Sequence, residues 1–221
     1  MMMPHVIRHV FVCTLFLASM LLAGRPVAAD ESSLGCNEDA MLVFDASGSM
    51  ASMGYNGLAI PRIFEARDAL REILPQVSPF RRLGLVVYGP GPRNACSNVH
   101  LRLQPVPHAA DRILAEIEAL QPEGDTPLTE AVGKAAEALS HRDRPGIVVL
   151  VTDGRETCGG APCVLAEQIV RDSADLTVHV IGFRVRGESF DPTSFGDGGF
   201  EKGGYTQARC LADQTGGLYL S

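Results

Sequence analysis

Short apolar segments alternate with amphipathic segments along most of this chain, and this alternation is what most limits the folds it can adopt. Residues 40–45 and 147–151 have the length and composition of strands that are buried on both faces of a sheet. Residues 60–77 instead repeat apolar side chains at the three-and-four spacing of one helical face. Repeated strand–helix units predict an α/β fold with a doubly wound sheet and right-handed crossovers.

The expected elements cover most of the chain after its first forty residues. Strands are predicted at residues 40–45, 83–88, 99–103, 147–151, 176–183 and 218–220. Helices are predicted at residues 60–77, 110–120, 128–139, 163–173 and 207–214. A Gly-Pro-Gly-Pro turn at residues 89–92 separates the second and third strands. Because this connection is too short for a helical crossover, we expect that pair to be antiparallel.

The first 29 residues differ in character from the rest of the chain. One arginine and two histidines precede an apolar run at residues 10–23, and Val27-Ala28-Ala29 places small residues where signal peptidase cleaves. The run is shorter than the roughly 20 residues of a membrane-spanning helix. We therefore expect a signal peptide at 1–29, a short segment at 30–38, one domain at 39–221, and a periplasmic or secreted protein. Membrane attachment through an uncleaved signal segment is the alternative.

Three loops place polar residues at one edge of the expected sheet, where open α/β folds bind ligands. Asp45, Ser47 and Ser49 follow the first strand, Asp153 follows the fourth strand, and Thr126 precedes a central helix. Two carboxylates and three hydroxyls suit a small divalent cation, Mg²⁺ first and Mn²⁺ or Ca²⁺ as alternatives. Each fragment alone is equally typical of a turn or a helix cap. It is their combination that predicts a metal site.

These fragments resemble the metal-ion-dependent adhesion site of von Willebrand factor type A domains. The resemblance is carried by Asp-x-Ser-x-Ser at residues 45–49, Gly-Asp-Thr-Pro-Leu at 124–128 and Thr-Asp-Gly at 152–154. It covers roughly residues 39–221. Within the family, the chain is most similar to bacterial exported members, which have stretches like those at residues 87–89, 152–158 and 178–183.

The resemblance implies a six-stranded, mostly parallel sheet with one antiparallel edge strand and helices on both faces. It also implies that Ser47, Ser49 and Thr126 coordinate the metal directly or through water, while Asp45 and Asp153 supply charge. An Asp or Glu of a partner protein would complete the coordination. We therefore expect a partner-binding protein that is not an enzyme. An assembly or chaperone-like factor for an envelope enzyme, and a structural domain with a vestigial site, are the alternatives.

Five cysteines follow the signal segment, an odd number that leaves at least one without an intrachain partner. The Gly-Gly-Ala-Pro turn between Cys158 and Cys163 could bring these two within bridging distance, so we predict a disulfide there. The exported relatives often share counterparts of Cys96, Cys158, Cys163 and Cys210, which makes Cys36 the additional cysteine. A bridge from Cys36 to Cys210 is a further possibility. A structural zinc site would need a second close ligand pair.

Composition and motifs argue against several other functions. With 19 Lys and Arg against 26 Asp and Glu, the chain has no basic footprint for nucleic acid. An aspartyl-phosphate phosphatase would need an acidic residue in place of Ser47, and a serine hydrolase would need a positioned histidine.

Arg155 and Glu156 could rim the metal site or form a local salt bridge. The glycine-rich stretch 187–204 is expected to be a surface loop, with a specificity loop or a second cation site as alternatives.

Overall fold

The computed structural model describes residues 38–53, 60–92, 94–154, 156–183 and 207–220. The expected signal peptide, Cys36, Arg155 and the stretch 187–204 lie outside these residues, so the predictions that concern them alone stay predictions. In the ranges that are described, no helix combines the length and the apolar character needed to cross a membrane.

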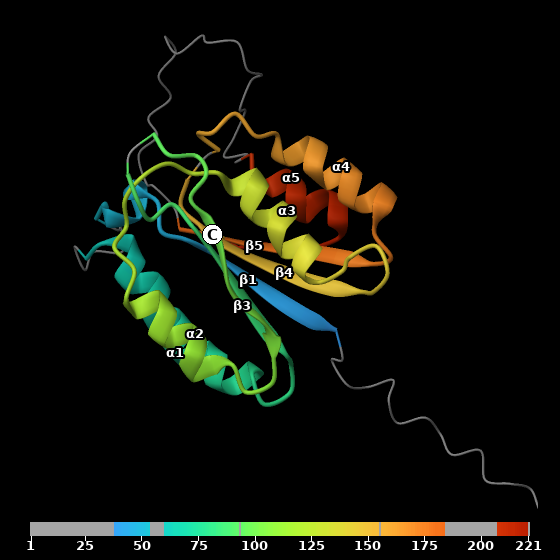
Figure 1. Ribbon diagram of the computed structural model, residues 1–221, viewed down its shortest axis with the longest axis horizontal. Coiled ribbons are helices and arrows are strands. Elements are labelled where there is room, and N and C mark those ends of the chain that lie inside the picture. The colour runs from blue at the N-terminus through green and yellow to red at the C-terminus, as the bar shows by residue number, and fades with distance from the viewer. Residues whose placement is uncertain (1–37, 54–59, 93, 155, 184–206, 221) are drawn as a thin grey trace, which may run out of the picture. The chain divides into compact units, whose positions relative to one another are not determined.

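A six-stranded sheet, with strand order β3-β2-β1-β4-β5-β6, forms the centre of the fold (Figure 1). Its strands are β1 (Asp39–Asp45), β2 (Leu83–Tyr88), β3 (Val99–Val106), β4 (Gly146–Thr152), β5 (Leu176–Gly182) and β6 (Tyr219–Leu220). All neighbouring pairs are parallel except β2 with β3, which lies at one edge of the sheet. The predicted antiparallel edge pair and the otherwise parallel sheet are therefore confirmed.

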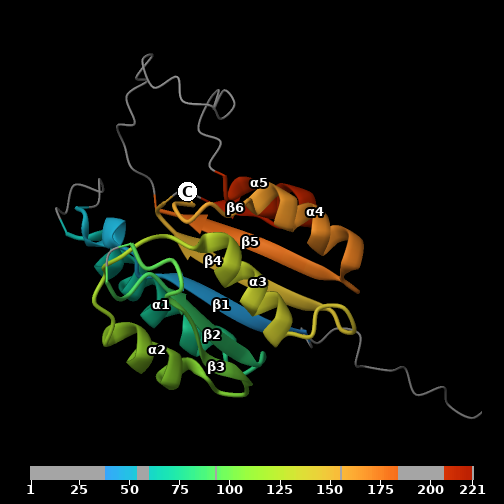
Figure 2. The same ribbon diagram turned by 45° about the horizontal axis from the view of Figure 1, so that its top comes forward.

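Helices cover both faces of the sheet (Figure 2). The helices α1 (Arg62–Val77) and α2 (Ala110–Glu118) lie on one face. On the other face lie α3 (Leu128–Ala138), α4 (Pro162–Asp172) and α5 (Arg209–Thr215). A short 3-10 helix, η2 (Gly48–Ala51), follows β1 and was not predicted from the sequence. The arrangement is the doubly wound α/β fold that the strand–helix alternation predicts.

The central strand β1 is buried on both faces, as its apolar sequence predicts. Met41 and Val43 pack into the core beneath α3, α4 and α5. Leu42 and Phe44 point the other way, into the core beneath α1 and α2. This alternation follows from the two-residue period of a strand, and it leaves Asp45 as the first polar side chain at the carboxyl end of β1.

The edge strand β3 is longer than expected, because it continues from the predicted end at residue 103 through Pro105 to Val106. A proline usually ends a strand, since it cannot donate a backbone hydrogen bond. At a sheet edge, however, one side of the strand has no neighbour that needs that hydrogen bond. The position of β3 in the sheet, which its own sequence does not specify, explains the difference.

Candidate functional site

The loops at the carboxyl edge of the sheet pack backbone against backbone. Gly89 and Gly124 both have positive φ angles, 98° and 79°, that favour glycine. A Cβ atom on Gly89 would lie 2.3 Å from the nitrogen of Ser47, and one on Gly124 would lie 2.4 Å from the carbonyl oxygen of Gly89. The two glycines therefore allow the loops after β1, after β2 and before α3 to meet.

Asp45 lies fully buried at the end of β1, with both carboxylate oxygens engaged. Its Oδ1 accepts a hydrogen bond of 2.8 Å from the Ser47 backbone N–H. Its Oδ2 accepts one of 2.7 Å from the Thr152 hydroxyl, which in turn accepts a hydrogen bond of 3.1 Å from the Tyr88 hydroxyl. Burial raises the pKa of Asp45 above its ordinary value, and the nearby Asp153 carboxylate raises it further.

Thr152 and Tyr88 are site residues that the sequence analysis missed. Each is the last residue of a strand beside β1, and Tyr88 pairs with Asp45 in the parallel register. Burial and the Asp45 charge raise the pKa of Tyr88 well above its ordinary value, so its hydroxyl stays protonated and can donate. The signal that could have found both residues is their position at the carboxyl ends of the neighbouring strands.

The two serines of the first loop lie directly beside Asp153. The hydroxyl oxygens of Ser47 and Ser49 are 3.1 Å apart, and Ser49 donates a hydrogen bond of 2.6 Å to Asp153 Oδ1. The Asp153 side chain has no exposed surface. A continuous set of oxygen atoms thus joins residues that are more than one hundred positions apart in the chain.

Thr126 reaches the same place from the loop before α3, and it is also buried. A Cβ atom added to Gly154 would lie 3.5 Å from the Ser49 hydroxyl oxygen and 3.7 Å from that of Thr126. The two hydroxyls therefore flank the small gap that the missing side chain of Gly154 leaves. The structure thus brings together the five predicted residues, Asp45, Ser47, Ser49, Thr126 and Asp153. Metal binding by these residues stays a prediction.

The chemistry of this donor set fits a divalent cation. All five side chains offer hard oxygen atoms, which Mg²⁺, Mn²⁺ and Ca²⁺ prefer. The two carboxylates are buried near each other, and that proximity opposes the ionisation of Asp45. A bound cation would relieve this repulsion. Asp45 and Asp153 would supply the charge, while the three hydroxyls would present lone pairs.

Arg62, the first residue of α1, also contacts the site and was not predicted to do so. Its guanidinium forms an ion pair with Asp153 Oδ2 and donates a hydrogen bond of 3.3 Å to the carbonyl oxygen of Ser49. The residue is 5% exposed. Because ten residues separate the end of η2 from the start of α1, nothing in the sequence pattern indicated that the helix begins against the site.

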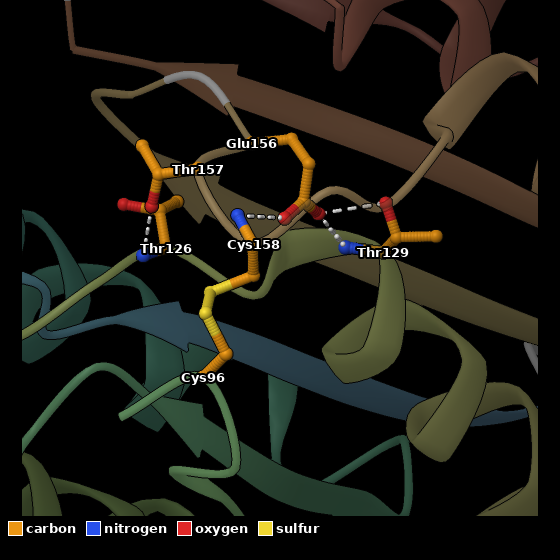
Figure 3. Close-up of a disulfide and its surroundings, with 6 residues drawn as sticks. All are labelled: Cys96, Thr126, Thr129, Glu156, Thr157 and Cys158. Atoms are coloured by element: carbon orange, nitrogen blue, oxygen red, sulfur yellow. Dashed lines mark hydrogen bonds between the residues drawn. A yellow bond between two sulfur atoms is a disulfide. The ribbon is translucent and has the colours of Figure 1, made fainter. Parts of the chain in front are cut away.

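The disulfide predicted between Cys158 and Cys163 is wrong. Cys158 bonds to Cys96, and Cys163 bonds to Cys210, which also contradicts a Cys36–Cys210 bridge. Cys158 lies before the helix α4, whereas Cys163 lies in its first turn and faces α5. Short separation in the sequence therefore does not place the two thiols together. Figure 3 shows how Cys96–Cys158 joins the loop before β3 to the loop that follows Asp153.

The Cys96–Cys158 disulfide lies next to a second connection that holds the Thr126 loop. The Thr157 hydroxyl accepts a hydrogen bond of 2.8 Å from the Thr126 backbone N–H, and the Thr157 N–H donates one of 3.2 Å to the Thr126 carbonyl oxygen. Figure 3 shows Thr126 and Thr157 beside the disulfide. Cys96, Cys158 and Asp125 also lie close enough to ligate one ion, but the disulfide occupies both sulfur atoms.

Glu156, expected either to rim the site or to form a salt bridge, instead caps the start of α3 (Figure 3). Its Oε2 accepts hydrogen bonds from the Thr129 backbone N–H and hydroxyl, at 2.8 and 2.7 Å. Its Oε1 accepts one of 2.8 Å from the Cys158 N–H. A carboxylate in this position satisfies free N–H groups and interacts favourably with the helix dipole. Glu156 therefore fixes the loop after β4 to α3.

We expect Glu156→Ala to lower the free energy of unfolding by about 1–2 kcal/mol, because it leaves the backbone N–H groups of Thr129 and Cys158 without an acceptor. Glu130→Ala is the matched control, since Glu130 lies in the same first helical turn but is exposed. Its effect should stay within about 0.5 kcal/mol. Urea unfolding of both variants measures the difference, and equal effects would contradict the capping role of Glu156.

Comparison with known proteins agrees with this geometry. The family model of the von Willebrand factor type A domain matches residues 40–156, and the chain belongs to this family. YwmD of Bacillus subtilis, an uncharacterised protein, is 27% identical over 176 residues, which are 76% of each chain.

Two solved structures show the same fold at lower identity. Proximal thread matrix protein 1 from the mussel byssus superposes with a TM-score of 0.54 at 14% identity over 84% of this chain. Zinc occupies its MIDAS motif, the abbreviation for a metal-ion-dependent adhesion site. Manganese-loaded TRAP protein from Plasmodium vivax superposes with a TM-score of 0.50 at 19% identity over 66% of this chain. This chain spans only 41% and 57% of those two chains. The first of these neighbours therefore holds zinc at a MIDAS motif and the second holds manganese, and both share the fold of this chain.

Proposed function

We propose that this chain is an exported protein that binds a partner protein through a divalent-metal site, and that it has no enzymatic activity. The site is made by Asp45, Ser47, Ser49, Thr126 and Asp153, and an Asp or Glu of the partner completes the coordination. The observation that carries the proposal is the convergence of these five buried or half-buried oxygen donors, from three distant loops, at one sheet edge. The metal-loaded neighbours support it.

Mg²⁺ is the ion that we propose, with Mn²⁺ or Ca²⁺ as substitutes. The site offers two carboxylates, and Mg²⁺ is commonly held by one or two carboxylates while it keeps several waters. A water in the coordination sphere is a position that an incoming carboxylate can take. Charge attraction and the direction of the metal–oxygen bond would then both contribute to recognition of the partner.

Export is proposed from two independent features. Residues 1–29 have the pattern of a cleaved signal peptide, which leaves the short segment 30–38 before the domain at 39–221. The two disulfides, Cys96–Cys158 and Cys163–Cys210, are of a kind that persists in oxidising compartments. Both features favour a periplasmic or secreted location.

A second candidate function is that of a structural domain without a working metal site. The ion pair between Arg62 and Asp153 favours it, because a guanidinium already neutralises one of the two carboxylates. The two candidates differ in one measurable property, which is whether a divalent cation stabilises the protein.

The test is thermal unfolding of the purified protein with increasing Mg²⁺ or Mn²⁺, compared with Thr126→Val. This variant keeps the shape of the side chain and removes the hydroxyl. At a metal concentration about ten times the Kd, the wild-type protein should gain about 1.4 kcal/mol, and the variant should need at least about tenfold more metal. Thr177→Val removes a hydroxyl near the start of β5, at the end of the strand that faces away from the carboxyl edge. This control variant should respond like the wild type. No response in any of the three proteins would favour the structural domain.

A further inference from the structure

Arg62 brings a positive charge into direct contact with the residues of the metal site. Its guanidinium is buried at the start of α1, pairs with Asp153 Oδ2 and also reaches the carbonyl oxygen of Ser49. Asp153 uses its other oxygen, Oδ1, to accept the hydrogen bond from Ser49. The carboxylate of Asp153 is therefore shared between the guanidinium and a hydroxyl of the site.

Anchoring α1 within the fold would not require such a contact. Arg67, one and a half turns further along α1, is just as buried, at 6% exposed against 5% for Arg62. The Arg67 guanidinium donates to the carbonyl oxygens of Ile117 and Leu120, at the end of α2. Its Nε also lies 4.0 Å from a carboxylate oxygen of the half-exposed Glu118. The helix thus already has a buried arginine that holds it to α2. Arg62 differs in binding a carboxylate of the site, while its own Nε has no hydrogen-bond partner among the described residues.

The net charge of the site determines which kind of ligand the site would attract once a metal ion is bound. The ionised carboxylates of Asp45 and Asp153 carry two negative charges, which would balance a dication. With Arg62 in contact, the protein contributes only one net negative charge, so a dication leaves the loaded site with one net positive charge. Because the side chains of Asp45, Asp153 and Arg62 are buried, an unbalanced charge of this kind interacts strongly with a ligand of opposite sign.

We propose that Arg62 determines the ligand specificity of the metal site: it weakens binding of the metal alone and makes the metal-loaded site select an anionic ligand. This inference rests on the proposed metal-dependent function. It deepens that function by assigning the preference for a carboxylate to the charge of a residue on α1. Metal and anionic ligand would then bind cooperatively, because each offsets the charge that the other leaves unbalanced.

The experiment is calorimetric titration of Mn²⁺ into the wild-type protein and into Arg62→Met, Arg62→Lys and Arg67→Met. Acetate is then titrated into each manganese-saturated protein as the probe for a carboxylate. Arg62→Met should bind Mn²⁺ about tenfold more tightly and acetate about tenfold more weakly than the wild type, as expected for loss of one charge near a dication. Arg62→Lys retains the charge and should resemble the wild type in both titrations. Arg67→Met should leave both affinities unchanged.

The outcomes separate this inference from the proposed function. Equal Mn²⁺ affinity in the wild type and Arg62→Met would overturn the role of Arg62 while leaving the metal site intact. Weaker Mn²⁺ binding in both Arg62 variants would also overturn it, because Arg62 would then only position Asp153. If no protein binds Mn²⁺, the proposed function and this inference both fail. If only Arg62→Met binds, the inference is supported. Circular dichroism of each variant confirms that it is folded.

Discussion

We expect Asp45→Asn to stabilise the metal-free protein by about 1–2 kcal/mol at pH 7 and to abolish its response to divalent cations. The two effects have opposite signs and one cause. Burial and the Asp153 carboxylate both oppose ionisation of Asp45, so the charged form is costly until a cation binds. The amide of asparagine removes the charge, and with it both the cost and the attraction for the metal.

The hydrogen bonds around Asp45 can be kept in this variant. The amide oxygen of asparagine can accept from the Ser47 N–H in place of Oδ1. Its NH₂ group can donate to the Thr152 hydroxyl, and that hydroxyl can then donate to Tyr88. In this reversed order the Tyr88 hydroxyl accepts from Thr152, so its own proton gives up the Thr152 oxygen as an acceptor. That change in hydrogen bonding can only lower the stability of the variant. A net gain in stability would therefore report the removal of the charge.

The effect of Asp45→Asn should also depend on pH. Because the folded protein raises the pKa of Asp45, the carboxyl binds its proton more tightly when folded than when unfolded. Above the raised pKa the ionised carboxylate lowers the stability of the wild type, and this penalty disappears as the pH falls toward the ordinary value. The advantage of the variant should therefore be largest at pH 7 and should shrink on acidification.

Urea unfolding in EDTA at pH 7 and at pH 4.5 measures this difference, followed by the same measurement with Mn²⁺. Asp125→Asn is the control, since Asp125 precedes Thr126 in the same loop and is only half-buried. This control should change the free energy of unfolding of the metal-free protein by no more than about 0.5 kcal/mol. Its stabilisation by Mn²⁺ should equal that of the wild type. A less stable Asp45→Asn protein at pH 7 would contradict the electrostatic account of the site.

The sequence was sufficient to predict the fold because periodicity reports directly on burial. A run such as residues 40–45 can only be buried on both faces, and the three-and-four spacing at 60–77 can only present one apolar face. The five oxygen donors were predictable for a related reason. In a parallel sheet, the ends of the strands share one edge whatever the exact register.

Other features depend on distances that no local pattern encodes. The contact of Arg62 with Asp153 depends on where in space α1 begins. The role of Thr152 and Tyr88 depends on strand neighbours that the sequence does not specify. The correct disulfides depend on which loops and helices lie side by side, and this is why the shortest sequence separation was misleading.

The two disulfides should contribute similarly to stability but differently to the metal site. They join residues that are 62 and 47 positions apart, so the two disulfides close chain segments of similar length. Removal of either should therefore lower the free energy of unfolding by about 2–4 kcal/mol. The Cys163–Cys210 bond connects the first turns of α4 and α5, two helices that contain none of the five oxygen donors. The Cys96–Cys158 bond instead immobilises the residue next to Thr157, which holds the Thr126 loop through two hydrogen bonds.

Comparison of the two double variants separates these contributions. We expect Cys96→Ala/Cys158→Ala to weaken Mn²⁺ binding by about tenfold, since ordering the Thr126 loop would then cost free energy when the metal binds. Cys163→Ala/Cys210→Ala should unfold at a similarly reduced urea concentration but bind Mn²⁺ like the wild type. Calorimetric titration below the unfolding temperature of both variants measures the affinities. Equal affinities would mean that the hydrogen bonds of Thr157 alone hold the Thr126 loop, and that the disulfide beside them serves only the stability of the fold.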